Sequence, residues 1–137
     1  MRAFLVGAAM TLFIGCAPGN IATSTCESEI AFLAIGDPWS CTVKGDVVGQ
    51  ASWIEFNTES RNTIARVNIA LRVKKGTLRV NYQDLAGEQH LLVTPSEPAA
   101  LTMQTRMHRE RRSFTLSFEP VNGEVEGLAG TVKYSTP

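Results

Sequence analysis

The sequence has little of what catalytic and metal sites are usually built from. Its 137 residues include two histidines and three cysteines. It has no Cys-x-x-Cys pair, no His-Glu-x-x-His segment, no Gly-x-Ser-x-Gly elbow and no glycine-rich phosphate loop. Zinc, redox, serine-hydrolase and nucleotide chemistry therefore have no motif here. We expect a protein that is not an enzyme and that uses no cofactor and no metal.

The chain also lacks an excess of charge of either sign. Its 13 basic and 13 acidic residues give a formal net charge of zero. A balanced chain has no overall attraction for nucleic acid, so we expect no nucleic-acid partner. The charges are nevertheless uneven, since residues 61–81 carry six cations and no acid, and residues 106–112 carry four arginines.

Long apolar runs are missing except at the start of the chain. Arg2 precedes an apolar stretch over residues 3–14, which ends at Gly15-Cys16. A cation followed by a short apolar core is typical of a secretory signal, and this core is too short to span a bilayer. The segment Leu12-Phe13-Ile14-Gly15-Cys16 resembles the lipobox of bacterial lipoproteins.

This resemblance implies that the protein is located in the cell envelope. Residues 1–15 would be the signal peptide, and residues 16–25 would be the lipidated cysteine and a short tether. Cys16 would carry a diacylglycerol and an amide-linked fatty acid such as palmitate, which together anchor a protein stably. Ala17 after the cysteine implies the outer membrane in a Gram-negative cell. The membrane is thus one expected partner.

Cysteine parity agrees with a lipidated Cys16. An odd cysteine in an exported protein needs an explanation, and a lipid on Cys16 leaves Cys26 and Cys41 to pair. The compartment beyond the inner membrane is oxidising. We therefore predict a disulfide between Cys26 and Cys41.

The rest of the chain, residues 26–137, is predicted to be a single antiparallel β-sandwich domain. Short segments of alternating apolar and polar residues are separated by turn residues, which indicates seven to nine strands. Their spacing fits an immunoglobulin-like or a jelly-roll-like order equally. In addition, Ser24-Thr25-Cys26-Glu27 has the spacing of a helix capping box, which predicts a short helix from Thr25 to Ile35. The alternative there is a buried strand over residues 30–35.

The clearest strand pair is predicted on either side of Lys75-Gly76. Val67, Ile69, Leu71 and Val73 would face the core from one strand, as would Leu78, Val80 and Tyr82 from the next. A two-residue loop would place Leu71 opposite Val80, and Arg72 opposite Arg79 on the outer face. Further along, Phe114, Leu116 and Phe118 are predicted core residues. Asn122-Gly123 is the strongest short turn signal.

Several arginines are candidates for contact with an acidic partner or with anionic headgroups. The alternative is that they form an ordinary solvated surface. They are Arg66, Arg72, Arg79, Arg106, Arg109, Arg111 and Arg112. The nearby Met103, Met107 and His108 could suggest copper(I), but on a strand the methionines would face away from the histidine.

Two functions fit these observations. The first, which we favour at this point, is a non-enzymatic envelope lipoprotein that binds another envelope protein or helps assemble a complex. The second is a module that binds glycan, cell-wall polymer or anionic lipid through Trp39, Trp53 or the arginine loop. A groove lined by aromatic side chains would favour the second, and a flat basic sheet face without a pocket would favour the first. Convergence of His90 or His108 with a carboxylate and a hydroxyl would instead indicate an enzyme.

Overall fold

Eight antiparallel β-strands make up the regular structure of the described residues. The computed structural model describes residues 21–28, 39–58 and 63–135, so the predicted signal peptide and Cys16 lie outside the described residues. The strands are β1 (Thr23–Ser28), β2 (Trp39–Val48), β3 (Ser52–Asn57), β4 (Ile64–Arg72), β5 (Lys75–Asp84), β6 (Gly87–Val93), β7 (Ala99–Arg106) and β8 (Ser113–Ser135).

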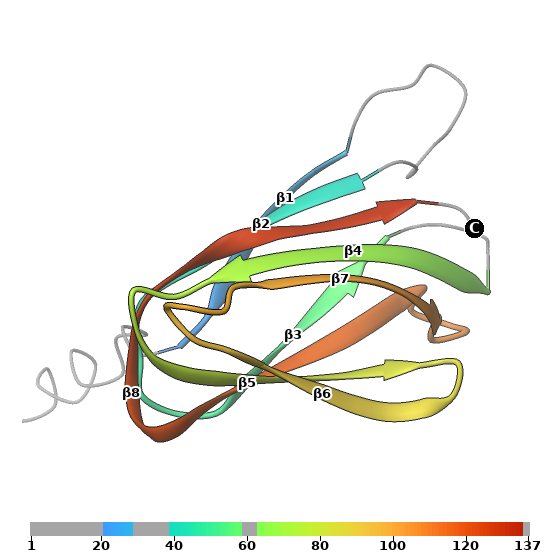
Figure 1. Cartoon of the computed structure of the whole chain (residues 1–137). Coiled ribbons are helices and arrows are strands. Elements are labelled where there is room, and N and C mark those ends of the chain that lie inside the picture. Colours follow the sequence, from blue (N-terminus) through green and yellow to red (C-terminus); the bar gives the residue numbers. More distant parts are fainter. Residues whose placement is uncertain (1–20, 29–38, 59–62, 136–137) are drawn as a thin grey trace, which may run out of the picture.

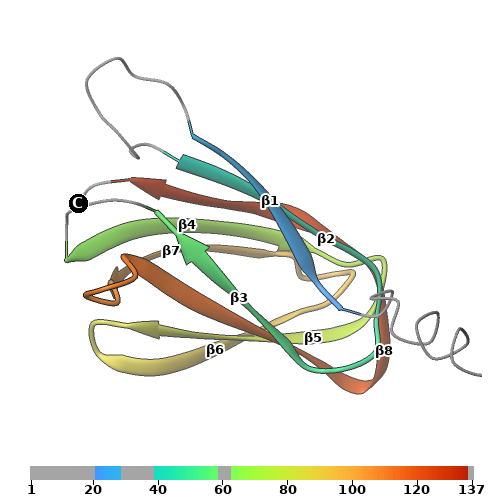
Figure 2. The same cartoon turned by 180° about the vertical axis from the view of Figure 1, so that it is seen from behind.

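The strands form two layers, which confirms the predicted β-sandwich. One layer, called here the five-strand sheet, has the order β1-β2-β8-β4-β7. In the other, called the four-strand sheet, β8 pairs with β3 and β5, and β5 pairs with β6 (Figures 1 and 2). In each sheet β8 lies between two earlier strands, which are β2 and β4 in the five-strand sheet and β3 and β5 in the four-strand sheet. This interleaved order is that of a jelly roll and not of an immunoglobulin-like sandwich.

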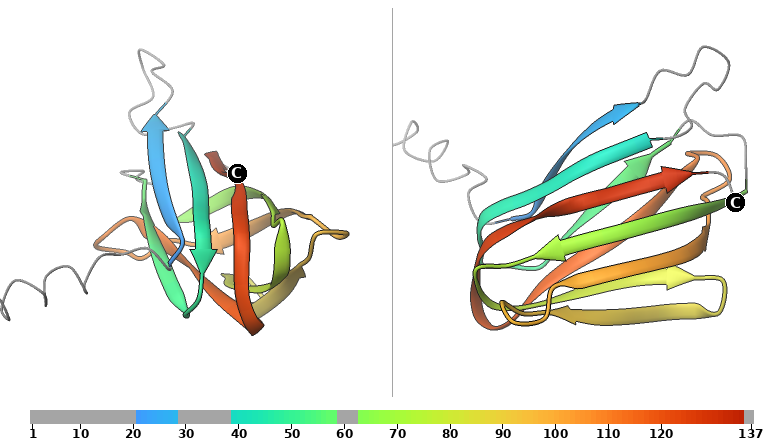
Figure 3. Two further views of the ribbon diagram at one scale, coloured as in Figure 1. Left: turned by 90° about the vertical axis from the view of Figure 1, so that its left-hand side faces the viewer. Right: turned by 45° about the horizontal axis from the view of Figure 1, so that its top comes forward.

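The two layers share β8, which is long enough to belong to both. Its first part pairs with β3 and β5, and its last part with β2 and β4. Between them Asn122 and Gly123 have φ angles of 61° and 115°. The predicted turn at Asn122-Gly123 is therefore not a hairpin; it is the corner at which β8 passes from one sheet to the other. Figure 3 shows this corner at one end of the sandwich, called here the corner end.

The core lies between the sheets and is built by the predicted alternation. Val67, Ile69 and Leu71 on β4 are at most 2% exposed, while the residues between them are exposed. Leu116 and Phe118 on β8 are fully buried and Phe114 is nearly so. Alternation with period two thus identified the inward faces of β4 and β8 correctly.

The predicted hairpin between residues 63–73 and 77–84 is wrong. β4 pairs with β7 and β8, whereas β5 pairs with β6 and β8, so the two strands lie in opposite sheets. Arg72 lies opposite Ala129 and Arg79 opposite Glu119, and the two arginines do not face each other. The apolar pattern shows which side of each strand is buried. Two strands with matching apolar sides can be neighbours in one sheet, or they can face each other from opposite sheets, and the pattern does not distinguish the two arrangements.

The predicted helix from Thr25 to Ile35 is wrong over the residues that the structure describes. Residues 25–28 belong to β1, which pairs with β2 so that Cys26 faces Cys41. Residues 29–35, and with them the alternative strand, lie outside the described part. A local capping signal is weak compared with a complete ladder of backbone hydrogen bonds. No described segment is a helix able to cross a membrane.

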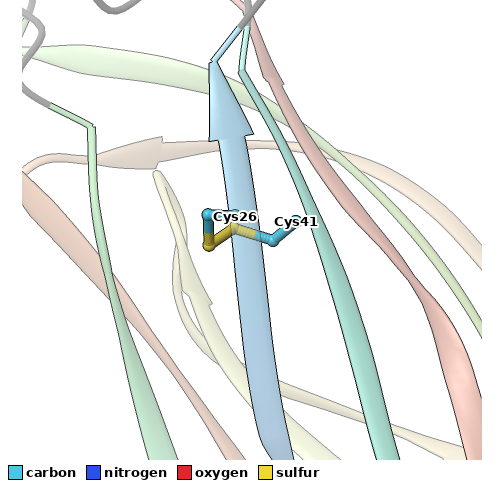
Figure 4. Close-up of a disulfide and its surroundings, with 2 residues drawn as sticks. All are labelled: Cys26 and Cys41. Atoms are coloured by element: carbon cyan, nitrogen blue, oxygen red, sulfur yellow. A yellow bond between two sulfur atoms is a disulfide. The ribbon is translucent and has the colours of Figure 1, made fainter.

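The predicted disulfide between Cys26 and Cys41 is present. The two Cα atoms are 4.0 Å apart, and the bond joins β1 to β2 (Figure 4). Cys41 is completely buried whereas Cys26 is exposed, because β1 is the edge strand of its sheet. The bond therefore holds the edge of the five-strand sheet in place.

Candidate functional site

The outer face of the four-strand sheet carries a polar groove of about 570 Å³, called here the outer groove. It runs along the line where β5 meets β8 and is bordered by β6. Its lining residues with outward side chains include amides, hydroxyls, acids and one histidine. They are Arg79, Asn81, Gln83, Glu88, His90, Thr115, Ser117 and Glu119.

One row of side chains crosses this face from edge to edge. Trp53 on β3 is paired with Ser117 on β8, Ser117 with Asn81 on β5, and Asn81 with His90 on β6. Trp53 is 69% exposed, although tryptophan is a residue that folding normally buries. An uncovered indole thus lies immediately beside the polar groove.

Hydrogen bonds and an ion pair hold the groove side chains in position. The Asn81 amide donates to Glu119 Oε1 at 3.1 Å and to Ser117 Oγ at 3.4 Å. Glu119 also pairs with Arg79 at 3.7 Å. Because the charges of Arg79 and Glu119 are matched, these two groups present donors and acceptors without a strong local field.

A second hollow of about 490 Å³, called here the end wedge, opens at the end of the sandwich opposite the corner end. Pairing between β5 and β8 extends only as far as Asn81 and Ser117, and the wedge lies beyond that point. Met107 and Phe114, each about 5% exposed, contribute apolar surface to it. Gln83 and Thr115 line both hollows, so the wedge continues the outer groove.

The loop between β7 and β8 forms one rim of the wedge. The Arg111 backbone N–H donates to His108 Nδ1 at 3.2 Å, and the Arg112 N–H donates to the His108 carbonyl at 2.7 Å. The Arg111 guanidinium pairs with Glu55 on β3 at 3.3 Å. These contacts fix Arg111 across the rim, where it joins the loop to the four-strand sheet.

The opposite side of the molecule is different in chemistry. Strand register and exposure place five cations on the outer face of the five-strand sheet, called here the cationic face: Lys44, Arg66, Arg72, Arg106 and Lys133. Threonine, serine and alanine occupy most of the positions between them. None of the five cations forms an ion pair within the described part of the chain.

The predicted arginines therefore do not form one patch. Arg66, Arg72 and Arg106 lie on the cationic face. Arg79 and Arg111 are on the other sheet's side and are paired with acids. Arg109 and Arg112 are exposed in the loop between β7 and β8. The face that was expected to be basic exists, but with a different membership from the predicted stripe of Arg72 and Arg79.

Among the described residues there is no cluster of metal ligands, whereas His90 lines the outer groove together with Glu88, Glu119 and Ser117. Met103 and Met107 are buried while His108 is exposed, as their alternation predicted. No group of three or more His, Cys, Asp or Glu side chains within residues 21–28, 39–58 and 63–135 could hold a metal. His90 and Ser117 are separated by Asn81, or about 9.6 Å at normal strand spacing, which is too far for direct proton transfer.

The conditions set for the two function classes are met only in part. The outer groove is lined mainly by polar side chains, with Trp53 next to it on β3, and the outer face of the five-strand sheet is basic, as expected of an interaction module. Trp39 begins β2, but its side chain lies outside the described part. Sequence reasoning missed Asn81, Ser117 and Glu119, because outward polar residues on distant strands become a site only once the pairing of those strands is known.

Comparisons with known proteins add little to this picture. No family model matches the chain, and no curated protein is significantly similar to it. A similar solved structure is the CBM22-1 xylan-binding domain from Paenibacillus barcinonensis Xyn10C, with 12% identity and a TM-score of 0.40. The similarity covers 85% of this chain and 83% of that domain. Since the TM-score is below 0.5, we base no argument on it.

Proposed function

We propose that this protein is a non-catalytic module that binds a glycan in the outer groove. The observation that carries the proposal is the row from Trp53 to His90, in which an exposed indole adjoins positioned hydroxyl, amide and imidazole groups. Polar groups that are fixed in place can orient a bound ligand, and the adjoining indole supplies apolar contact.

Sugars match this arrangement in both of their chemical aspects. Their hydroxyl groups donate and accept, as do the Asn81 amide, the Ser117 hydroxyl and the Glu119 carboxylate. Their C–H faces are apolar and can cover the exposed indole of Trp53, which would remove its surface from water. The matched charges of Arg79 and Glu119 favour a ligand that is largely neutral.

The length of the groove favours a chain over a single sugar. From Arg79 to Asp84 along β5 the groove and wedge extend for about 17 Å at the normal rise per residue. This is longer than one sugar ring, and Gln83 and Thr115 make the path continuous. We therefore expect oligosaccharides to bind more tightly than monosaccharides.

The test is calorimetric titration of the protein with soluble oligosaccharides prepared from cell-wall and capsular polymers. Trp53→Ala is expected to weaken binding at least about tenfold, equivalent to about 1.4 kcal/mol. Asn81→Ala is expected to do the same. Asn68→Ala is the matched control, since Asn68 is an exposed asparagine of β4 on the other sheet, bonded to Thr102 at 2.7 Å.

Equal affinity of Trp53→Ala, Asn81→Ala and the unchanged protein for every bound glycan would contradict the proposal. So would the absence of binding to any glycan in such a panel. Loss of binding in Asn68→Ala as well would place the ligand elsewhere on the molecule.

We also propose that the module works in the cell envelope, attached through a lipid on Cys16. The support is the resemblance of residues 12–16 to a lipobox, together with a disulfide that uses up the two remaining cysteines. Mass spectrometry of the native amino terminus tests this directly. A first residue other than Cys16, or a Cys16 without fatty acid, would contradict it.

A further inference from the structure

We infer that the cationic face docks flat on a bilayer rich in anionic lipid, so that the outer groove points away from the membrane. This inference concerns a different surface from the proposed glycan site and does not depend on it. Its basis is the position and the unmatched charge of Lys44, Arg66, Arg72, Arg106 and Lys133.

The face has the extent and the composition that contact with a bilayer requires. Five neighbouring strands make it about 19 Å wide, and β4 alone separates Arg66 from Arg72 by about 20 Å. The positions between the cations carry short side chains such as Thr42, Thr131 and Ala70, so the long cationic side chains project beyond them. The acids on this face are Asp46, exposed on β2 two residues from Lys44, and Glu27 at the β1 edge, whose side chain lies outside the described part.

Charge decides the class of partner. An arginine whose charge is already matched, as in Arg79 with Glu119, gains little from an external anion. The five cations of this face have no such match among the described residues. Near an anionic membrane each Lys or Arg strengthens binding about fivefold, so several together are sufficient for stable association.

The path of the chain allows this orientation. Ala22 lies against Gly45 at the corner end, and Thr23 is paired with Lys44, which belongs to the cationic face. Four residues lie between Cys16 and Ile21, so their Cα atoms are at most about 18 Å apart. A lipid on Cys16 could therefore reach a bilayer lying against this face.

The experiment measures which lysines the membrane covers. The full-length protein isolated from cells is bound to phosphatidylglycerol vesicles or to phosphatidylcholine vesicles, and its lysines are acetylated with a water-soluble reagent. We expect acetylation of Lys44 and Lys133 to be slowed severalfold on the anionic vesicles only. Lys75 is the internal control, because it begins β5 at the corner between the sheets, off the cationic face, and its side chain is 79% exposed in its pair with Glu126.

Charge reversal supplies the matched comparison. Arg66→Glu with Arg72→Glu should remove the protection of Lys44 and Lys133. It should weaken partition to anionic vesicles at least about 30-fold from the loss of two cations, and the two added carboxylates should weaken it further. Arg109→Glu with Arg112→Glu changes the net charge equally but lies in the loop between β7 and β8, and it should leave protection unchanged. In 1 M salt, where the screening length is about 3 Å, the difference should disappear.

Three outcomes would overturn the inference. One is equal acetylation of Lys44 and Lys133 on both kinds of vesicle, and another is equal loss of protection in the two charge-reversal variants. The third is protection that appears only when envelope proteins are added, which would identify the face as a docking site for an acidic protein.

Discussion

The two outer faces of the sandwich share a core and one strand, yet their surfaces differ in almost every respect. The exposed large hydrophobic residues Trp53, Leu85 and Leu92 all belong to the four-strand sheet or its turn. That side is hollowed, and its arginines are paired with acids. The five-strand sheet presents short polar side chains and unpaired cations. A single fold therefore offers one surface suited to a specific ligand and another suited to a broad anionic partner.

The arginines show that residue type alone does not determine the role of a side chain. Arg79 and Arg111 lie 3.7 Å and 3.3 Å from carboxylates, and both help to hold the walls of the groove and wedge. Arg66 and Arg72 have no such partner among the described residues and remain available to an external anion. Strand order, which decides the neighbours of each arginine, separates the two groups.

The largest expected effect comes from the part that the faces share. Phe118→Ala removes a fully buried ring from β8 and should lower the free energy of unfolding by about 3 to 5 kcal/mol. Glycan binding and vesicle binding should then fail together on heating. Phe118→Leu, which keeps most of the volume, should cost less than about 1.5 kcal/mol. Chemical denaturation measures both, and equal losses in the two variants would show that the site is loosely packed.

The next effect should be confined to the five-strand sheet. Replacing Cys26 and Cys41 by alanine opens a loop with a sequence separation of 15, which should lower the free energy of unfolding by about 3 kcal/mol. Because β1 is an edge strand far from the outer groove, glycan affinity at a temperature where the variant stays folded should be unchanged. A matching fall in glycan affinity would mean that the two faces are coupled.

The smallest effect on stability should come from within the outer groove. Glu119→Gln removes the charge that pairs with Arg79, and both side chains are about 40% exposed, so the free energy of unfolding should change by less than about 1 kcal/mol. Glycan affinity should fall about tenfold, since a charged hydrogen-bond acceptor is lost. Thermal denaturation and calorimetry on one sample separate the two effects. A large loss of stability with unchanged affinity would give Glu119 a structural role only.

The sequence was sufficient to predict the inward faces of the strands and the disulfide. Alternation in β4 and β8 directly reflects which side is buried, and the expectation of a lipid on Cys16 left only Cys26 and Cys41 to pair. The strand pairing could not be predicted from the sequence. The apolar pattern of β4 and β5 is the same whether the two strands are neighbours or face each other across the core. For the same reason Asn122-Gly123 signalled a change of direction without showing that it was a corner between two sheets.

The groove could not be predicted because it depends on that pairing. Trp53, Ser117, Asn81 and His90 are far apart in the chain and form one row only in this strand order. The run of cations over residues 61–81 correctly predicted that one sheet face is basic. The prediction of which residues form that face was wrong. Arg79 belongs to that run in sequence and to the opposite sheet in space.

The most direct test is to measure glycan affinity and anionic-vesicle affinity side by side for Trp53→Ala and for Arg66→Glu with Arg72→Glu. The two faces act independently if the first variant loses only glycan binding and the second loses only vesicle binding. Loss of both activities in either folded variant, or loss of the opposite activity, would contradict the assignment of separate roles to the two sheets.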